Sequence, residues 1–261
     1  REQYGDTPLF YGQVYNAPVK LDIQGNMCVP VEKLGSAQYA PAPKVDGEKD
    51  RYVITGYKRS YEYMDEFKML FPRMHSGQQS HIQAYKEWAN VKGKKIRYDY
   101  CGQSKTEYCP TFGENLRFFF RYQVNFMYWR YFMWNFAGRQ NDLQSSGELT
   151  KGNWISGIPF IDNALLGDQS KLPTELRENK GHNVYYFLPL LLGLVAIFWQ
   201  LGKSNNRSKN REGYRSFAIV FLLFFLTGLA IVVYLNQTPY QPRERDYAYA
   251  GSFYAFCIWI G

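Results

Sequence analysis

The sequence predicts a mainly α-helical integral membrane protein with a transmembrane helical hairpin, the start of a third span, a mixed α/β or loop-rich exoplasmic region and an aromatic interfacial helix. Two observations carry this class. Residues 184–202 and 216–235 are apolar runs without a charged residue. At helical rise each is long enough to cross roughly 28–30 Å of hydrocarbon. The alternative is that both runs are buried core helices of one small domain.

Residues 1–110 contrast with these runs because they are polar, rich in Tyr and interrupted by Gly and Pro. Short runs at 27–31, 51–57 and 95–100 have the composition of strands. Residues 80–91 have the pattern of a short amphipathic helix. We therefore expect a mixed α/β or loop-rich region on the exoplasmic side of the membrane.

Two cysteines in this region, Cys101 and Cys109, are separated by seven residues. This spacing fits neither a CxxC redox motif nor a common zinc site. If the segment is exoplasmic, the two residues are candidates for a small disulfide loop. The alternative is a pair of unpaired thiols in a turn. The three histidines form no metal-binding spacing, and we predict no metal site.

Residues 111–137 form the next segment, with twelve aromatic residues between Phe112 and Phe136. Thr111 followed by Glu114 is the capping-box pattern, which predicts a helix that starts there. The segment also contains Arg117, Arg121 and Arg130. It is too polar for a lipid-facing span. An interfacial helix in the headgroup region accommodates both the rings and the charges. A buried core helix is the alternative.

The charges around the apolar runs predict the topology. Residues 138–183 read as an exoplasmic loop and linker, whereas residues 203–215 carry five basic residues and one acidic residue. By the positive-inside rule the basic loop faces the cytoplasm. Residues 236–246 then form an exoplasmic loop, and 247–261 start a third span that is cut short, so we expect a piece of a longer protein. The predicted location is a bacterial inner membrane, multi-pass, with residues 1–183 in the periplasm and membrane lipids as partners.

The overall charge also limits the function. The net charge is +8, but no basic face or nucleic-acid-binding motif concentrates it, so we predict no nucleic-acid partner. No P-loop or Rossmann glycine pattern is present, and we predict no nucleotide cofactor.

The charged tetrad in the loop after the second run is the first candidate site. Its guanidinium groups can bind a phosphate or carboxylate through two hydrogen bonds each, and its carboxylates can neutralise them or act as acid and base. The alternative is an internal ion-pair network that fixes the loop. The residues are Arg243, Glu244, Arg245 and Asp246.

A second polar cluster follows the aromatic segment. Its donors and acceptors suit sugar hydroxyls, and Trp129 and Trp134 nearby are candidate stacking platforms. Ordinary helix-terminus and turn chemistry is the alternative. The residues are Arg139, Gln140, Asn141 and Asp142.

Several stretches resemble the bacterial members of the protein O-mannosyltransferase-like membrane family, which was long catalogued as a domain of unknown function. They are "PTFGENLRFFFRYQVNFMYWRYFMWNFAGRQND", "GNWISGIPFID", "YYFLPLLLGL" and "FLTGLAIVVYLNQTPYQPRERDYAYAGSFYAFCIWIG". The first and last are the most specific, and the opening "REQYGDTPLFYGQ" is similar too.

This resemblance implies a C-type glycosyltransferase that moves a sugar from a polyprenyl-phosphate carrier to a Ser or Thr hydroxyl outside the cytoplasm. A lipid-linked sugar donor and a protein acceptor are then its partners. The implied catalytic carboxylate lies in an early exoplasmic loop, before residue 1, so no catalytic residue is assigned here. Residues 139–142 and 243–246 carry over only as family-typical positions. The alternative function is a non-enzymatic scaffold or accessory subunit of a cell-envelope complex, whose aromatic helix docks a partner.

Overall fold

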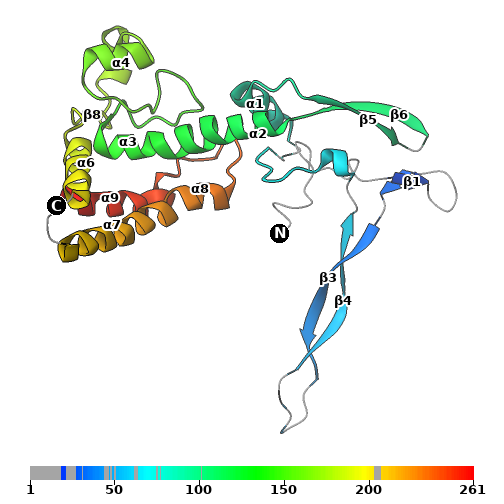
Figure 1. Cartoon of the computed structure of the whole chain (residues 1–261). Helices are drawn as coiled ribbons and strands as arrows, with labels where there is room; N and C mark the ends of the chain where they lie inside the picture. Colours follow the sequence, from blue (N-terminus) through cyan, green and yellow to red (C-terminus); the bar gives the residue numbers. More distant parts are fainter. Residues whose placement is uncertain are drawn as a thin grey trace. The chain divides into compact units, whose positions relative to one another are not determined.

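The computed structural model describes residues 19–21, 28–30, 32–43, 47, 49, 51–61, 64–74, 76, 78–100, 102–202 and 207–261. The chain divides into two compact units, Arg1–Leu116 and Arg117–Gly261. Unit 1 carries the long β-strands, and unit 2 carries most of the helices (Figure 1).

The described residues of unit 1 form three antiparallel strand pairs. Strands β1 (Val19–Leu21) and β2 (Cys28–Pro30) form the first pair. The long strands β3 (Glu32–Pro41) and β4 (Tyr52–Tyr61) form the second, with register shifts on either side of Ala37 and Gln38. Strands β5 (Lys94–Tyr100) and β6 (Gln103–Cys109) form the third. The prediction of strands at 51–57 and 95–100 is confirmed.

Before α2, the described residues of unit 1 form the 3₁₀ turn η2 (Asp65–Phe67) and the helix α1 (Gln79–Ala89). The residues buried between η2 and the β5–β6 pair are Phe67, Ile96, Tyr98 and Cys109. The exposed β3–β4 pair contributes no residue to this core. The helix α1 confirms the short amphipathic helix expected at 80–91, with ends that differ by one and two residues.

The helix α2 (Phe112–Phe118) begins with the predicted capping box. The Thr111 amide donates to the Glu114 carboxylate at 2.8 Å, and the Glu114 amide donates to the Thr111 hydroxyl at 3.3 Å. Glu114 also accepts from the amides of Lys92 and Gly93, at 2.7 and 3.2 Å. The Glu114 carboxylate thus accepts hydrogen bonds from the amide at the start of α2 and from the two amides that precede β5.

Unit 2 starts with a continuation of this helix. The segment η3 (Phe119–Trp129) is π-helical, and α3 (Arg130–Phe136) returns to α-helical turns. Short elements follow: β7 (Gly138–Arg139), α4 (Pro159–Leu166), η4 (Gln169–Lys171), α5 (Thr174–Arg177) and β8 (Asn183–Val184). The remaining helices are α6 (Leu188–Leu201), α7 (Arg207–Thr227), α8 (Leu229–Leu235), the 3₁₀ turn η5 (Asp246–Tyr249) and α9 (Ala250–Ile260).

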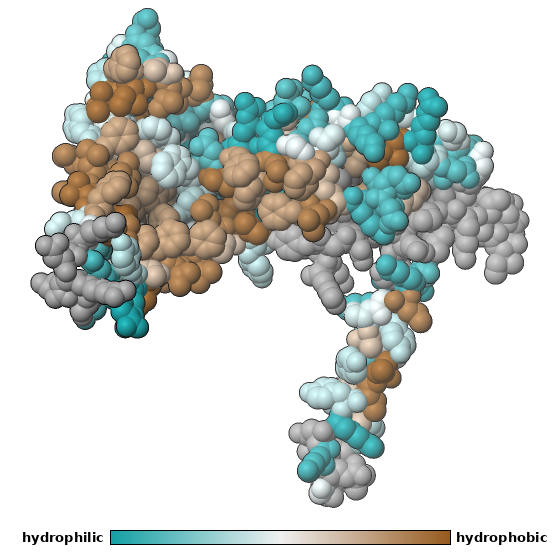
Figure 2. Space-filling model, viewed as in Figure 1, coloured by the Kyte–Doolittle hydropathy of each residue, from teal (hydrophilic) through white to brown (hydrophobic). Residues whose placement is uncertain are grey.

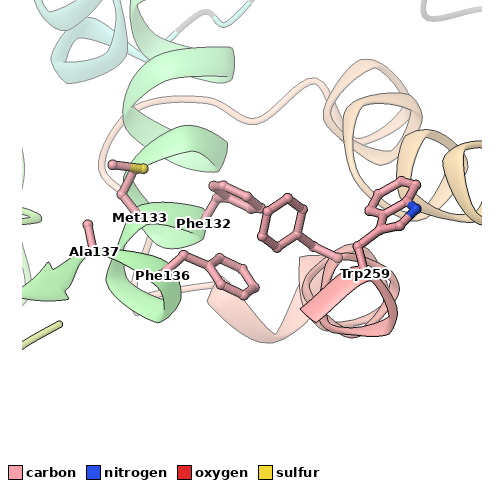
Figure 3. Packing of buried hydrophobic residues seen from close by; sticks show 6 residues of the cluster. Phe132, Met133, Phe136, Ala137 and Trp259 are labelled. Atoms are coloured by element: carbon pink, nitrogen blue, oxygen red, sulfur yellow. The ribbon is translucent and has the colours of Figure 1, made fainter. Parts of the chain in front are cut away.

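The core of unit 2 lies where α3, α6, α7 and α9 meet. Phe256 of α9 packs edge-to-face on Phe132 and Phe136 of α3, with ring centroids 5.1 and 4.6 Å apart. Trp259 of α9, Met133 of α3 and Ala137, which directly follows α3, complete the buried cluster (Figure 3). Gly193 lets α6 approach, because a Cβ there would lie 2.6 Å from the Phe256 ring.

This packing overturns the predicted multi-pass membrane fold. The first predicted span, 184–202, contains only α6, whose 14 residues cover about 21 Å. Val184 belongs to β8, which pairs with β7, and Tyr186 and Phe187 have positive φ angles that stop the helix from starting earlier. The predicted start of a third span, 247–261, is an 11-residue helix after a 3₁₀ turn, and its inner face is buried in protein. The described chain is a mixed α/β structure.

The predicted interfacial helix is also wrong, and the buried-helix alternative holds. Most of α3 is inaccessible to solvent, including Tyr131 and Phe132. The polar residue Arg130, only 4% exposed, is accommodated by protein partners rather than by lipid headgroups. Most aromatic residues of the segment therefore belong to the protein core, whereas Phe112, Phe120 and Trp129 are exposed.

One helix in the described part of the chain, Asn210–Leu235, is long and apolar enough to cross a membrane. It has 26 residues, and 11% of its most apolar window is buried. Figure 2 shows apolar residues gathered on the visible surface over the helices of unit 2. The large exposed side chains of α6 and α7 include Val195, Phe198, Ile219 and Leu222.

Candidate functional site

The candidate site in unit 2 is organised by an ion pair between α3 and the segment 243–246. Arg130 donates from Nη2 to Glu244 Oε2 at 2.9 Å and from Nη1 to Oε1 at 3.4 Å. Arg130 also donates to the carbonyl oxygens of Phe126 and Gly152, at 3.0 and 2.7 Å. A guanidinium satisfied in this way is held in one orientation.

Aromatic rings surround the same guanidinium. Its central carbon lies 4.1 Å from the ring centroid of Phe126, 4.4 Å from Tyr131 and 4.9 Å from Trp134. Cation–π contacts of this kind are strongest where water is excluded. The charge of Arg130 is therefore stabilised by three ring faces as well as by Glu244.

Glu244 accepts from two further donors. The Tyr131 hydroxyl donates a short hydrogen bond to Oε2, and the Ser145 amide donates to Oε1 at 3.1 Å. Burial raises the pKa of Tyr131 well above its usual value, and although the Arg130 charge opposes this, the bond to Glu244 adds to it. Glu244 thus accepts hydrogen bonds that hold its segment against α3. These contacts do not support a role for Glu244 as a catalytic acid or base.

The two arginines on either side of Glu244 form no such ion pair in the described chain. No carboxylate of the described chain lies within 4.0 Å of the guanidinium of Arg243 or Arg245. Arg243 is exposed, and its guanidinium carbon lies 5.5 Å from the Tyr247 ring centroid. Arg245 is partly buried, and its Nε is buried without an acceptor. Asp246 begins the turn η5.

Two residues of the second predicted cluster form hydrogen bonds to residues that follow α3 in the chain. Gln140 and Asn141 are buried. Gln140 Nε2 donates to Leu149 O at 3.1 Å and to Gln169 Oε1 at 2.7 Å. Asn141 Nδ2 donates to Thr150 O at 2.9 Å. The side-chain amides of Gln140 and Asn141 thus bind other groups of the protein, as the alternative of ordinary turn chemistry predicts.

Gly152 joins the two clusters. Its carbonyl accepts from Arg130, and its amide donates to Asn141 Oδ1 at 2.8 Å. Its φ of +57° is a conformation that favours glycine. The structure thereby brings together two candidate clusters that lie far apart in the chain.

The remaining predicted site residues differ in their solvent exposure and in their contacts. Arg139 lies over the Trp134 ring at 4.0 Å and donates to Asn141 O at 3.0 Å, while Asp142 is exposed. Trp134 is buried under Arg130 and Arg139, so neither face is open to a sugar. Trp129 is 40% exposed and stacks on Phe132 at 5.3 Å.

The candidate disulfide stays a prediction. Cys109 is buried at the end of β6, where burial raises the pKa of its thiol to about 12 with help from the charges of Glu107 and Glu114. Cys101 lies outside the described residues.

Sequence reasoning missed a buried polar group that adjoins the segment. Gln123 of η3 donates to Asn236 Oδ1 at 2.9 Å and to Gln237 O at 3.0 Å. Tyr249 donates to Gln237 Oε1 at 3.4 Å. The only available signal was an uncharged polar pair between an apolar run and a charged loop, which is ordinary at a helix end.

Comparison with known proteins places only the first part of the chain. Residues 5–120 match the sequence model of a family of unknown function (DUF8416), which is less than half of the chain. No curated protein and no solved structure matches the chain. The matched residues end close to the boundary between the units, so the Arg130–Glu244 site lies outside the match.

Proposed function

We propose that the chain is part of a glycosyltransferase that binds the phosphate of a polyprenyl-phosphate-linked sugar at residues 243–246 and transfers the sugar to a protein Ser or Thr hydroxyl. The observation that carries this proposal is the unequal use of the charges. Glu244 is committed to Arg130, whereas Arg243 and Arg245 on either side of it have no carboxylate partner within the described chain. Two arginines that flank one residue and have no carboxylate partner in the described chain favour an anionic ligand.

A phosphate suits these groups better than a simple carboxylate. Each guanidinium offers a planar fork of donors that matches phosphate oxygens. A phosphate has enough oxygens to engage both forks, whereas one carboxylate is saturated by a single bidentate partner. The segment also connects two apolar helices, α8 and α9, with exposed side chains such as Tyr234 and Tyr254. A ligand that joins a phosphate to an apolar chain is consistent with both features.

The reaction class rests on the resemblance of residues 110–142 and 225–261 to O-mannosyltransferase-like proteins. The described residues supply no unengaged carboxylate beside the two arginines except Asp246, and the resemblance assigns the catalytic carboxylate to a region before residue 1. In this proposal the chain binds and orients the carrier, and the general base is supplied from elsewhere.

Contact with lipid is part of the same proposal. The helix Asn210–Leu235 exposes Ile219, Leu222 and Leu226 along its length and carries exposed Arg211 and Arg215 near its start. Basic residues beside an apolar helical face attract anionic lipid headgroups. We propose that this helix rests against an anionic bilayer, which would bring a lipid-linked donor within reach.

Ligand binding tests the proposal directly. The full chain in detergent is titrated calorimetrically with farnesyl phosphate and, separately, with farnesol. We expect Arg243→Ala and Arg245→Ala each to weaken farnesyl phosphate binding about tenfold, since a hydrogen bond to a charged group contributes about 1.5–3 kcal/mol. Farnesol binding should not change. Arg177→Ala, which removes an exposed arginine of the same unit, is the matched control. Equal binding of phosphate and alcohol, or no effect of either substitution, contradicts the proposal.

A scaffold function is the second candidate, and one observation favours it. Glu244, Gln140 and Asn141 are all consumed by internal contacts, as expected if the clusters only stabilise the fold. A scaffold should tolerate Arg243→Ala but lose a partner when exposed aromatic residues of η3, Phe120 or Trp129, are changed to Ser.

A further inference from the structure

The strand pair β3–β4 has two faces that differ in character. In the described chain these two strands pair only with each other. Residues directly opposite each other in an antiparallel pair lie on the same face, so the register assigns the faces even across the two register shifts. The pairs from Leu34–Arg59 to Pro41–Tyr52 that share a face with Leu34 form a surface that we call the ribbon face. The ion pair of Arg59 with Glu32, at 3.8 Å, agrees with this assignment, since both residues fall on that face.

The ribbon face is apolar and uncovered. Five of its large side chains are at least half exposed: Leu34, Tyr39, Tyr52, Ile54 and Tyr57. The buried core described for unit 1 includes no residue of either strand. A two-stranded pair is only marginally stable in water unless a further layer covers its apolar side. The ribbon face therefore calls for a partner surface.

The opposite face of the pair is more polar. It carries Lys33 and Gln38, together with Ala40 and the exposed Val53. The register shifts bend and twist the strands, and such irregularities discourage the addition of another strand at an edge. A partner is therefore expected on the ribbon face rather than along the strand edges.

The area of the ribbon face matches what a second copy of the chain needs. At about 200 Å² for a fully exposed side chain of this size, the five side chains expose roughly 600 Å². Two such faces in contact would bury about 1,200 Å² in total, the lower limit for stable specific interfaces. Hydrocarbon suits this surface less well, because the outer edges of β3 and β4 carry backbone groups that lipid cannot satisfy.

A two-fold axis that runs across the strands makes the ribbon face complementary to itself. Such an axis reverses the order of the cross-strand pairs and lays each strand over its own counterpart. Ala37 then faces Tyr39 of the second copy, and Ile54 faces Tyr57. Each ring thus lies opposite a smaller side chain, which lets the two layers interdigitate.

The charge at the end of the ribbon face selects this axis. With the axis across the strands, Arg59 faces Tyr52 of the second copy, which offers a cation–π contact. An axis along the strands would instead place Arg59 over Leu34, which offers the guanidinium no partner. The arrangement with reversed strands is the one that accommodates the charge.

We propose that the ribbon face is a homodimer interface, in which two copies of the chain pack their β3–β4 pairs face to face about a two-fold axis across the strands. This inference goes beyond the proposed function, because it makes no use of residues 243–246 or of any ligand. The partner it names is a second copy of this chain.

Self-association of the full chain in detergent tests the interface. Sedimentation velocity over a concentration series should show a dimer for the parent. Ile54→Lys should weaken the association at least about tenfold, because it buries a charge without a partner. Val53→Lys is the matched control, since it introduces the same charge into the same strand on the opposite face and should dimerise like the parent. A monomeric parent, or equal association of the two folded variants, overturns the proposal.

An exchange of charges tests the two-fold arrangement. Arg59→Glu should weaken dimerisation, and the double variant Arg59→Glu/Tyr52→Arg should restore it, because the two new charges meet across the interface. Within one copy the two positions are roughly 20 Å apart along β4, so the rescue can arise only between copies. A double variant that associates no better than Arg59→Glu contradicts this arrangement. If Ile54→Lys abolishes flotation with lipid vesicles and leaves self-association unchanged, the ribbon face binds a bilayer and the homodimer is wrong.

Discussion

Arg130 and Glu244 are separated by 114 residues, and their side chains form two parallel hydrogen bonds inside unit 2. The Arg130 side chain is 4% exposed and that of Glu244 is 19% exposed. A pair this deeply buried contributes little net stability as a pair, but the loss of one partner leaves the other charge without compensation. The pair therefore fixes the segment 243–246 to α3 and sets the positions of Arg243 and Arg245.

Removal of one partner should be costly. Glu244→Gln leaves the Arg130 charge buried, and we expect the free energy of unfolding to fall by about 3 kcal/mol. Urea unfolding followed by tryptophan fluorescence measures this, since Trp134 lies against Arg130. Glu178→Gln removes the exposed partner of Arg177 and should cost less than about 0.5 kcal/mol. A Glu244→Gln variant as stable as the parent would show that the ion pair has no structural role.

The double variant should recover part of the loss. Arg130→Met together with Glu244→Gln removes both charges, so no buried ion is left unpaired. We expect the double variant to be more stable than Glu244→Gln alone, with a coupling free energy of about 1–3 kcal/mol. The same urea titrations on the two single variants and the double variant give this value. Strict additivity would mean that the two side chains do not interact.

The capping box predicts a pH dependence. Burial tends to raise the pKa of Glu114, but the amide bonds from Thr111, Lys92 and Gly93 outweigh it and lower the pKa below 4.5. A carboxyl group with a lowered pKa in the folded state stabilises the fold above its unfolded pKa. That contribution is lost as the pH falls below about 4.5 and through the folded value.

Glu114→Gln tests this dependence. At pH 7 the substitution should lower the free energy of unfolding by about 1 kcal/mol, as the loss of a helix cap does. The difference between parent and variant should shrink at about pH 3, because the parent carboxylate is then increasingly protonated. Urea unfolding at the two pH values measures both differences. A difference that is unchanged or larger at the lower pH is incompatible with the lowered pKa.

Two glycines should respond in opposite directions to Ala. Gly138 has φ +147°, and a Cβ there would lie 2.6 Å from Asn183 O and 2.8 Å from Ile155 O, which are backbone atoms. We expect Gly138→Ala to destabilise the chain by about 2 kcal/mol or more. Gly113 lies in α2, where an added Cβ would have no other atom within 4 Å, so Gly113→Ala should stabilise the chain by about 0.5 kcal/mol. Thermal unfolding of both variants gives the signs.

The proposed lipid contact predicts charge-dependent vesicle binding. Arg211→Glu and Arg215→Glu should each reduce flotation with vesicles of about 80% phosphatidylcholine and 20% phosphatidylglycerol by more than roughly fivefold in partition coefficient, since loss of one basic residue alone costs about 1 kcal/mol and the new negative charge repels the lipid. Arg177→Glu makes the same charge change elsewhere in unit 2 and should have little effect. Equal flotation with pure phosphatidylcholine would contradict the charge term.

Local features of the chain could be predicted from the sequence by itself. The start of α2 follows from Thr111 and Glu114, whose side chains reach only to nearby amides. The helical nature of residues 188–201 and 216–235, and the strands at 95–100, follow from periodicity and apolar content. The candidate polar residues could be named too, because clusters of charge between apolar runs are visible without a structure.

Which surface covers each helix was decided only by the tertiary structure. A helix rich in rings and apolar residues has the same composition whether protein or lipid surrounds it. The aromatic helix is buried because α6, α7 and α9 pack on it, and this packing is a relation between distant segments. Likewise, Glu244 has a structural role because it pairs with Arg130. The local sequence around either residue does not indicate this pairing. Sequence periodicity reports the backbone and the apolar face of an element, but the partner of that face depends on how the whole chain is folded.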